Sequence, residues 1–372
     1  MSVRRGALAL LATVALAALA VACTGDEPPS APTSTPTATV EATRTAAPPA
    51  TATPAPTPAP PLVVAFIGDL MFDREVELAM ETEGPAYTFE RVRPLFAGTD
   101  LVVGNLEGTL SSGGTPLDKV YQFQTAPDLG VAALVEGGVD VVSLSNNHAT
   151  DYGIAGLEET LVALGDLEYY GAGLTEDLAR AARHVQPDGQ PRTLSFLGYS
   201  DIGETIFALG AQGGVSRADV ETIAEDVSRE REQFPGNVIV VSLHFGTEYR
   251  HEPTDRQREL ARAAIDAGAD LVVGHHPHAL QPVEAYRDGL ILYSLGNFVF
   301  DLDAEDLEVL GPGPFQSVVA VVTFEEGERP ALELRPAWID VWENRPRPAT
   351  EEEAAAILDL LAPRSQTPAA PD

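Results

Sequence analysis

Seven apolar runs of strand length constrain the fold of this 372-residue chain more than any other feature. They are LVVAFIGD, DLVVGNLE, VDVVSLSNNH, TLSFLGYS, NVIVVSLHFG, ADLVVGHHPH and GLILYSLGNF. Most of them are separated by segments with helical spacing of apolar residues, such as 217–234 and 255–268. Because the runs are continuous, the strands should be buried on both faces by helices. We therefore predict an α/β fold with mostly parallel core strands.

The amino-terminal segment has the pattern of a secretory signal peptide. Arg4 and Arg5 precede a continuous apolar run, which ends in Ala20-Val21-Ala22 just before Cys23. This end resembles a bacterial lipobox, and the resemblance implies that Cys23 is lipidated and anchors the mature protein. The alternatives are a signal peptide without lipid and an uncleaved anchor helix, although the run is short for a membrane span.

The composition divides the chain into four parts. We expect a lipoprotein signal peptide at 1–23, a disordered Pro/Thr/Ala-rich tether at 24–61, a folded domain at 62–345, and a carboxyl-terminal helix with a disordered tail at 346–372. Within the folded part, residues 317–340 predict a hairpin with its turn around 326–329. Thr350 and Glu353 have the spacing of a capping box at the start of the last helix.

The charge composition excludes some classes of partner. The formal net charge of −33 would repel nucleic acid and anionic membrane surfaces, so we expect no nucleic-acid partner and membrane contact only through the lipid. Nearly all basic residues are arginine, and Lys119 is the only lysine, which we attribute to compositional bias. Cys23 is the only cysteine, so the folded part has no disulfide framework and no thiol nucleophile.

Polar side chains follow five of the apolar runs. They are Asp69 after the first; Asn105 and Glu107; Asn146, Asn147 and His148, with Asp151 just beyond; His244; and His275, His276 and His278. In open parallel sheets, ligands bind at the carboxyl ends of the strands, so these groups should converge on one crevice. Carboxylates, amides and imidazoles without cysteine suit Mn, Fe or Zn, and there are enough donors for one or two divalent ions.

Each of these residues also has an ordinary explanation when it is taken singly. An aspartate or asparagine after a strand is often a turn former, and a single histidine is more often hydrogen-bonded filler than a ligand. However, five of the seven histidines lie at the ends of three strands. Burying several unpaired acids together costs several kcal/mol unless a cation compensates, so the pattern as a whole favours a metal site.

A series of motifs identifies a family resemblance. GDLMFDR, GNLEGTLS, VVSLSNNHATDYG, HFGTEY, GHHPHALQPVE and LYSLGNFVF, with VYQFQTAP among them, run in order from about Val63 to Phe300. This series closely resembles the CapA family of poly-gamma-glutamate capsule biosynthesis proteins. The resemblance implies a calcineurin-like metallophosphoesterase fold, which is a four-layer α/β sandwich with a metal site at the strand ends. The Asp-x-His signature of that superfamily is missing after the first strand, which weakens an assignment as a phosphatase.

The resemblance implies a role for each matching residue. The metal ligands would be Asp69, Glu107, Asn147, His244, His276 and His278. His148 would protonate the leaving group or stabilise the transition state, and Asp151 would orient it. Residues expected to support a ligand or bind substrate are Asn105, His275, Asn297, Glu248 and Arg74. Glu248 could instead be a general acid or base, Asn297 a turn former, and Arg74 either a contact to a substrate carboxylate or phosphate or part of a surface salt bridge.

Three functions are compatible with the sequence. The first is a metal-dependent hydrolase or transferase that acts on poly-gamma-glutamate or a related extracellular polymer, using metal-activated water or an acceptor group. The second is a phosphoesterase on an extracellular phosphorylated substrate. The third is a non-catalytic polymer-binding or assembly protein. In each case we expect a lipid-anchored protein on the extracytoplasmic face of a bacterial cell membrane, with capsule synthesis or export membrane proteins as further partners.

Overall fold

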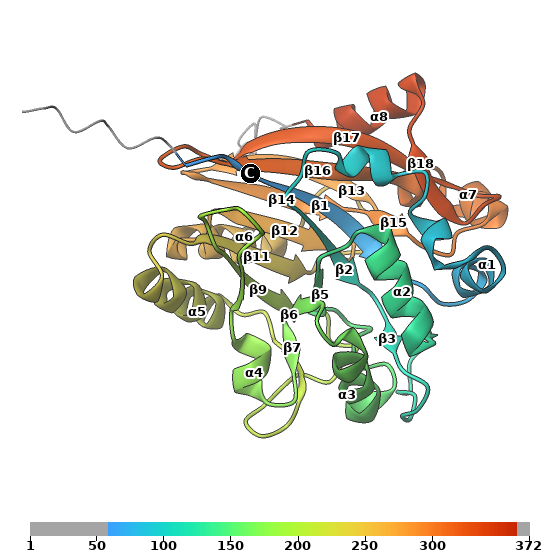
Figure 1. The fold of residues 1–372 in the computed structure, drawn as a ribbon, viewed down its shortest axis with the longest axis horizontal. Helices are drawn as coiled ribbons and strands as arrows, with labels where there is room; N and C mark the ends of the chain where they lie inside the picture. The colour runs from blue at the N-terminus through green and yellow to red at the C-terminus, as the bar shows by residue number, and fades with distance from the viewer. Residues whose placement is uncertain (1–58, 363–372) are drawn as a thin grey trace, which may run out of the picture. The chain divides into compact units, whose positions relative to one another are not determined.

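The computed structural model describes residues 59–362 of the chain. The predicted signal peptide, Cys23 and nearly all of the predicted tether lie outside the described residues. Within 59–362, two large sheets pack face to face, and helices cover their outer faces (Figure 1). This is the four-layer α/β sandwich that we expected.

The first sheet has eight strands. Its order is β18 (Arg345–Pro348), β17 (Ala331–Asp340), β16 (Gln316–Phe324), β1 (Leu62–Leu70), β2 (Leu101–Leu106), β5 (Val141–Ser143) and β6 (Glu168–Tyr170). The short strand β15 (Asn297–Val299) also pairs with β1. From β1 to β6 all neighbours run parallel, whereas β16, β17 and β18 extend the sheet in antiparallel pairs.

The second sheet has six strands. Its order is β13 (Leu280–Tyr286), β14 (Gly289–Leu295), β12 (Leu271–His275), β11 (Val238–His244), β9 (Leu194–Ser200) and β8 (Arg183–Val185). The four central strands are parallel, and the two edge strands are antiparallel to their neighbours. The four parallel strands β14, β12, β11 and β9 correspond to four of the apolar runs in the sequence.

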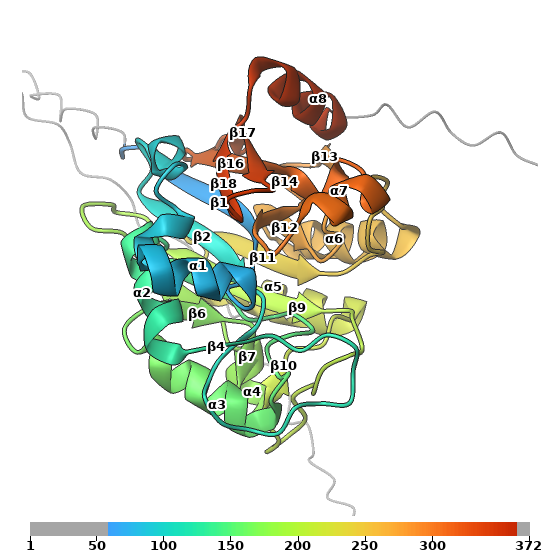
Figure 2. The ribbon, with the colours of Figure 1, turned by 90° about the vertical axis from the view of Figure 1, so that its right-hand side faces the viewer.

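Helices form the two outer layers. One side of the sandwich carries α1 (Glu75–Glu83), α2 (Pro127–Gly137) and α3 (Gly153–Leu164), and the other carries α5 (Val220–Gln233) and α6 (Asp255–Ala267) (Figure 1). Figure 2, which looks from the right of Figure 1, shows α1 and α2 in front of the first sheet. Shorter elements connect these layers: α4 (Glu176–Arg180), α7 (Ala304–Leu310), η1 (Pro85–Thr88), η2 (Arg93–Phe96), η3 (Gly313–Phe315), and the strand pairs β3 (Thr109–Leu110) with β4 (Gln124–Thr125) and β7 (Ala172–Gly173) with β10 (Gly214–Val215).

Strand β1 shows why the apolar runs are continuous. Its residues Leu62, Val64 and Phe66 pack into the core between the two sheets, whereas Ala65 and Ile67 pack toward the helices. Successive side chains of a strand point to opposite faces, so a strand that is buried on both sides needs apolar residues at every position. Asp69 is a polar and fully buried side chain within this strand, and apolar burial continues after it at Leu70 and Phe72.

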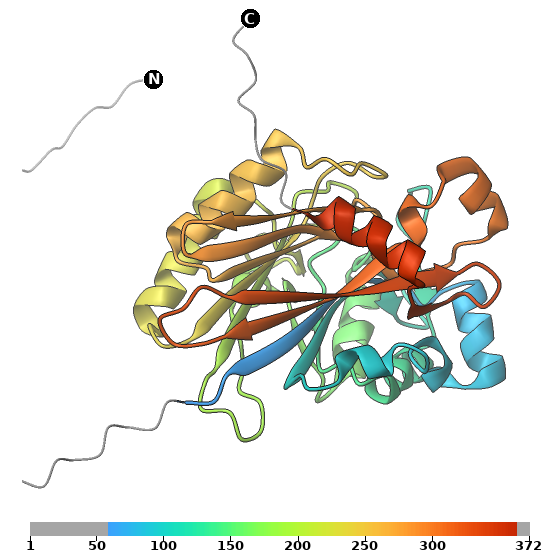
Figure 3. The ribbon, with the colours of Figure 1, turned by 90° about the horizontal axis from the view of Figure 1, so that it is seen from above.

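The carboxyl-terminal part belongs to the same packed unit. The predicted hairpin is present as β16 and β17, and residues 345–348 add β18 to its edge. Helix α8 (Glu351–Leu361) contacts β13 of one sheet and β16 and β17 of the other, which Figure 3 shows in red. Because Ile357 and Leu361 are buried in the core between the sheets, the folded part continues beyond the expected boundary at 345.

Within residues 59–362, no helix has the length and apolar character that a bilayer span requires.

The start of α8 generates a prediction about stability and pH. Glu353 receives two hydrogen bonds of 2.8 Å from Arg347 and closes the capping box with Thr350. The hydrogen bonds from Arg347 lower the pKa of Glu353 from its ordinary 4.5 to about 2. The charged form therefore stabilises the fold fully above pH 4.5, and this stabilisation is lost as the pH falls from 4.5 toward 2.

We expect Glu353→Gln to lower the free energy of unfolding by about 1–2 kcal/mol at pH 7, measured by urea denaturation. The difference from the wild type should shrink as the pH falls below 4.5. Glu352→Gln is the matched control, because Glu352 lies in the same first turn but is exposed. An equal loss in both variants, or a difference that does not depend on pH, would contradict this assignment.

Candidate metal centre

The strand ends bring the predicted polar residues together at one edge of each sheet. In the first sheet, Asp69 of β1 lies opposite Asn105 of β2 and Asn297 of β15. In the second sheet, His244 of β11 lies opposite His275 of β12. The register between β1 and β2 shifts between Phe66 and Asp69, and such irregularities often re-aim a side chain beside a functional site.

In β1 and β12 a glycine precedes the polar residue, for a steric reason. A Cβ atom on Gly68 would lie 2.0 Å from the carbonyl oxygen of Gly296, and one on Gly274 would lie 2.0 Å from that of Tyr293. Asp69 in turn donates its backbone N–H to the Gly296 oxygen at 3.0 Å. The glycines therefore let neighbouring backbones approach closely, which fixes the positions from which Asp69 and His275 project.

Two carboxylates form the buried floor of the site. Asp69 and Glu107 are both fully buried. The Asn105 side-chain amide donates to Asp69 Oδ1 at 3.0 Å and reaches Glu107 Oε2 at 3.5 Å, and Asn146 donates to Asn105 Oδ1 at 3.0 Å. The two asparagines thus hold the carboxylates in place without adding a compensating positive charge.

Histidines from two further segments face this floor. His275 Nδ1 lies 3.1 Å from Asp69 Oδ1, and His278 Nδ1 lies 2.8 Å from Asn297 Oδ1. His244 Nε2 lies 2.7 Å from Asn147 Oδ1, so two predicted ligand atoms already touch each other. The rings of His244 and His276 have their centroids 4.9 Å apart. The structure therefore brings all six predicted metal ligands into one cluster, which we call the ligand cluster.

The backbone around this histidine segment is strained. His276 has φ of 94° and His278 has φ of 50°, in the left-handed region that side chains other than glycine rarely adopt. Such conformations cost about 1–3 kcal/mol each, and they persist where the surrounding structure imposes them. The two strained residues flank Pro277, and both imidazoles lie in the ligand cluster with their ring centroids 5.8 Å apart.

The two carboxylates differ in their proton affinities. Burial, together with the charge of Asp69, raises the pKa of Glu107 well above its usual range. Burial would also raise the pKa of Asp69, but hydrogen bonds from His275 and His278 hold it well below its usual range. The floor of the site thus holds one firmly ionised carboxylate and one that lacks a sufficient positive partner.

Two neighbouring histidines are shifted in opposite directions. Burial and the charge of His278 lower the pKa of His276 to about 3. Burial acts on His278 in the same direction, but the charges of Glu107 and Asp69 raise its pKa to about 10. His276 is therefore a neutral imidazole with one ring nitrogen whose lone pair can bind an ion, whereas His278 carries a positive charge beside the two acids.

Several donor atoms of the ligand cluster fit a divalent ion. Glu107 Oε1, His244 Nδ1 and His276 Nδ1 are buried without a hydrogen-bond partner among the described residues. Leaving such a group unpaired costs about 1–3 kcal/mol, and ligation to a cation would satisfy it. Two groups of three have donor atoms within 4.8 Å of one another: Asp69 with Glu107 and His244, and Glu248 with His276 and His278. The donor set is one of nitrogen and oxygen atoms, which suits Mn, Fe or Zn.

Glu248 occupies a different place from the other acids. It is exposed, yet one of its carboxylate oxygens lies within 4.8 Å of a ring nitrogen of His276 and of His278. The sequence favoured a supporting role for Glu248, and the geometry also allows direct ligation.

His148 and Asp151 form a buried pair beside the ligand cluster. His148 Nδ1 lies 2.8 Å from Asp151 Oδ2, and His148 Nε2 lies 3.8 Å from Glu107 Oε1. Burial lowers the pKa of His148, although the hydrogen bond to Asp151 opposes this effect. An aspartate at Nδ1 fixes the tautomer, so Nε2 of His148 faces the crevice as the atom that can accept or deliver a proton.

Lys119 is the functional neighbour that sequence reasoning missed. Its ammonium lies 2.5 Å from Asp151 Oδ1 and donates to the carbonyl oxygens of Asn147 and Glu204, and its side chain is only 6% exposed. The one lysine of the chain thus neutralises the aspartate that orients His148. Its uniqueness among 23 basic residues was the available signal, and we had attributed it to composition.

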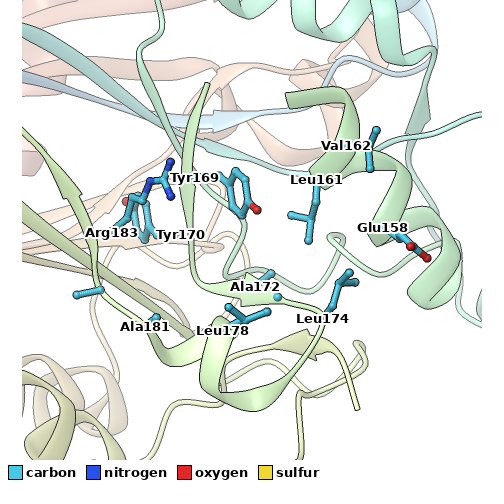
Figure 4. Close-up of a pocket in the computed structure, with 12 residues that line it drawn as sticks. Glu158, Leu161, Val162, Tyr169, Tyr170, Ala172, Leu174, Leu178, Ala181 and Arg183 are labelled. Carbon is cyan, nitrogen blue, oxygen red and sulfur yellow. The ribbon is translucent and has the colours of Figure 1, made fainter. Parts of the chain in front are cut away.

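An apolar pocket of about 370 Å³ lies elsewhere and shares no residue with the ligand cluster (Figure 4). Its lining includes Leu161 of α3, Leu178 of α4 and Tyr169 of β6. Its lining includes one carboxylate, Glu158, and no histidine, so the candidate chemistry stays with the strand-end cluster.

The buried Lys119–Asp151 pair generates a second prediction. We expect Lys119→Met to lower the free energy of unfolding by about 3–5 kcal/mol, because it leaves the Asp151 carboxylate buried without a cation. Adding Asp151→Asn in the same chain should recover part of this loss, since both charges are then removed.

The control for this prediction is Arg91→Met. Arg91 and Glu343 form a pair of 2.7 Å on the surface, where the loss should stay within about 1 kcal/mol. Chemical denaturation of the four proteins measures all the values. If Lys119→Met is no more destabilising than Arg91→Met, the buried pair does not neutralise Asp151 in the way that we infer.

Comparison with known proteins agrees with these motifs. The model of the family described as "Bacterial capsule synthesis protein PGA_cap" matches residues 63–302, which include every residue of the ligand cluster. The chain is 39% identical over 246 residues to the "PGA biosynthesis protein CapA" of Bacillus subtilis, and 36% identical over 253 residues to the "Capsule biosynthesis protein CapA" of Bacillus anthracis.

These matches cover 64% of this chain but only 63% and 60% of the two Bacillus proteins, so the chain spans about three-fifths of their length. It is also 31% identical to a "Probable polyglutamine synthesis accessory protein" of Mycobacterium tuberculosis, over 55% of this chain and 57% of that protein. With motifs, fold and family model in agreement, the chain belongs to the bacterial capsule synthesis protein PGA_cap family, the CapA family that its sequence resembles.

Proposed function

We propose that this protein is a metal-dependent hydrolase or transferase that acts on an extracellular, amide-linked acidic polymer such as poly-gamma-glutamate. The observation that carries the proposal is the buried ligand cluster. Its donor atoms Glu107 Oε1, His244 Nδ1 and His276 Nδ1 have no hydrogen-bond partner among the described residues. Membership of a capsule synthesis family supports the choice of polymer.

The proposed chemistry divides between the ion and the chain. A divalent ion in the ligand cluster would supply Lewis-acid activation of the attacking water or acceptor group and of the bond that breaks. Asp69, Glu107, Asn147, His244, His276 and His278 would hold it. His148 would exchange a proton at Nε2 with the reacting group, while Asp151 and Lys119 keep the imidazole in its orientation.

The net negative charge of the protein repels an anionic substrate, so the site must attract the substrate locally. The chain carries a formal charge of −33. The field near the reacting bond, however, is set by the closest charges, and a bound divalent ion would reverse its sign in the crevice. We therefore expect the polymer to bind at the crevice and not over the acidic surface as a whole.

The proposed location is the outer face of a bacterial cell membrane. It rests on the signal-peptide pattern and Cys23, which lie outside the described residues. An anchor there would place the site where an exported polymer passes, and capsule synthesis or export membrane proteins would be its neighbours.

The test of this function measures the chain length of poly-gamma-glutamate by size-exclusion chromatography after incubation with the protein and Mn, Fe or Zn. We expect the length distribution to change with the wild type and to stay constant with EDTA. His148→Gln should slow the change by about 10²–10⁴-fold, because it removes general acid–base catalysis. His184→Gln is the control, since His184 lies outside the ligand cluster and pairs with Glu230 at 2.7 Å.

Two results would contradict the proposal. A polymer that binds without any change in length would favour an assembly or binding role. Release of phosphate from nucleotides or phosphorylated glycans, with no effect on the polymer, would favour a phosphoesterase.

A further inference from the structure

The side chain of Arg74, beside the candidate metal centre, is held by aromatic rings and has no close hydrogen bond to a carboxylate among the described residues. The Arg74 guanidinium lies over the rings of Tyr121 and Phe123, with its Cζ atom 5.4 and 4.9 Å from their centroids. Its only ion pair among the described residues is with Asp301, at 4.0 Å, and the guanidinium donates no hydrogen bond to any of those residues. In contrast, Arg262 and Arg347 bind carboxylates at 2.6–2.8 Å. The guanidinium of Arg74 is thus positioned by the two rings, while its N–H groups donate no hydrogen bond to the described residues.

The backbone shows that this placement has a cost. Arg74 has φ of 60° and ψ of −127° at the start of α1, a conformation that side chains other than glycine rarely adopt. Its side chain is 40% exposed, so burial does not explain the strain. Strain that persists at an exposed residue next to a polar crevice is typical of a functional position.

Aromatic rings connect Arg74 to the reacting groups. Phe123 lies with its ring centroid 4.2 Å from that of His148, and Phe300 lies 5.0 Å from His278. Tyr249 lies 6.3 Å from His278 and also has a left-handed φ of 59°. Tyr121 and Tyr249 are 58% and 45% exposed. These rings form a partly apolar rim between Arg74 and the ligand cluster.

We infer that Arg74, with Tyr121 and Tyr249, forms a subsite that binds a carboxylate of an extended amide-linked chain lying across the mouth of the candidate metal centre. The inference deepens the proposed function and rests on it for the polymer. A guanidinium offers two parallel N–H donors that match a carboxylate, and stacking on Tyr121 and Phe123 orients the fork in advance. The exposed tyrosine rings provide flat surfaces for the amide backbone of such a chain.

The surrounding acids select the charge of the ligand. Asp301 is half-buried and interacts with Arg74 and also with Glu75, Asp303 and Asp306. This acidic setting repels a phosphate dianion more strongly than a carboxylate, which carries a single charge. Asp301 also competes for the guanidinium, so an incoming carboxylate has to displace a weak contact of 4.0 Å and not a close hydrogen bond.

Because Asp301 competes for the guanidinium, substitutions of Arg74 and of Asp301 should change the binding affinity in opposite directions. The probe is a fluorescein-labelled pentamer of gamma-linked glutamate, and its equilibrium binding to the full chain is measured by fluorescence anisotropy with Mn present. Every protein in this assay also carries His148→Gln, which slows turnover, so that binding is measured apart from it. We expect Arg74→Gln to weaken binding by about tenfold and Asp301→Asn to tighten it by about threefold.

The matched control is Arg329→Gln, which removes the same charge from the chain. Arg329 lies in the turn between β16 and β17, and the pairing of Leu62 with Phe324 puts that turn at the end of β1 opposite Asp69. Binding to this variant should be unchanged. Equal weakening in Arg74→Gln and Arg329→Gln would overturn the inference, because it would show only the effect of net charge.

Three further probes separate the subsite from the proposed function. A pentamer whose carboxylates are amidated should not bind, and its tight binding would overturn the inference. Equal binding of alpha-linked and gamma-linked pentamers, both dependent on Arg74, would support the subsite while removing support for poly-gamma-glutamate as the substrate. Displacement of the probe by equimolar inorganic phosphate, lost in Arg74→Gln, would show that the subsite takes phosphate and would overturn the carboxylate assignment.

Discussion

The structure around the crevice depends on the joint burial of Asp69 and Glu107. Two carboxylates without access to water repel each other and lose their hydration, and the neighbouring asparagines supply dipoles but no charge. Burial and the charge of Asp69 raise the pKa of Glu107, and the charges of both acids raise the pKa of His278 to about 10. A divalent ion would compensate the two carboxylates with more charge than His278 carries. It would also bind the donor atoms that have no hydrogen-bond partner among the described residues.

This requirement explains features that are otherwise unrelated. The close approach at Gly68 fixes where Asp69 projects, and the strained segment at His276 and His278 turns two imidazoles toward the acids. Lys119 neutralises Asp151 separately, so the aspartate that orients His148 does not add to the excess of negative charge. The two sheets pack against apolar cores on both faces. Such packing supports the strained backbone at His276 and His278.

Much of this arrangement could be predicted from the sequence, because it follows from local patterns. Continuous apolar runs indicated buried parallel strands, and the polar residues after them indicated a site at the strand ends. The division of the strands between two sheets could not be predicted in this way. Strands β1, β2 and β5 lie in one sheet and β9, β11 and β12 in the other, and this depends on contacts between distant segments. Lys119 was missed because it lies in an irregular loop, and its contact with Asp151 exists only in the folded chain. Arg74 was considered, but neither its stacking on Tyr121 nor its strained backbone has a signal in the sequence.

The central claim is that the ligand cluster binds metal. The most direct test is elemental analysis of the purified protein after equilibration with Mn, Fe or Zn and removal of free ions, beside a His276→Ala/His278→Ala variant. Between one and two equivalents per chain in the wild type, and a clear loss in the variant, are the result that we predict. A protein that folds normally and retains no ion under any of these conditions would contradict the claim, and it would leave His278 as the cation that compensates the buried acids.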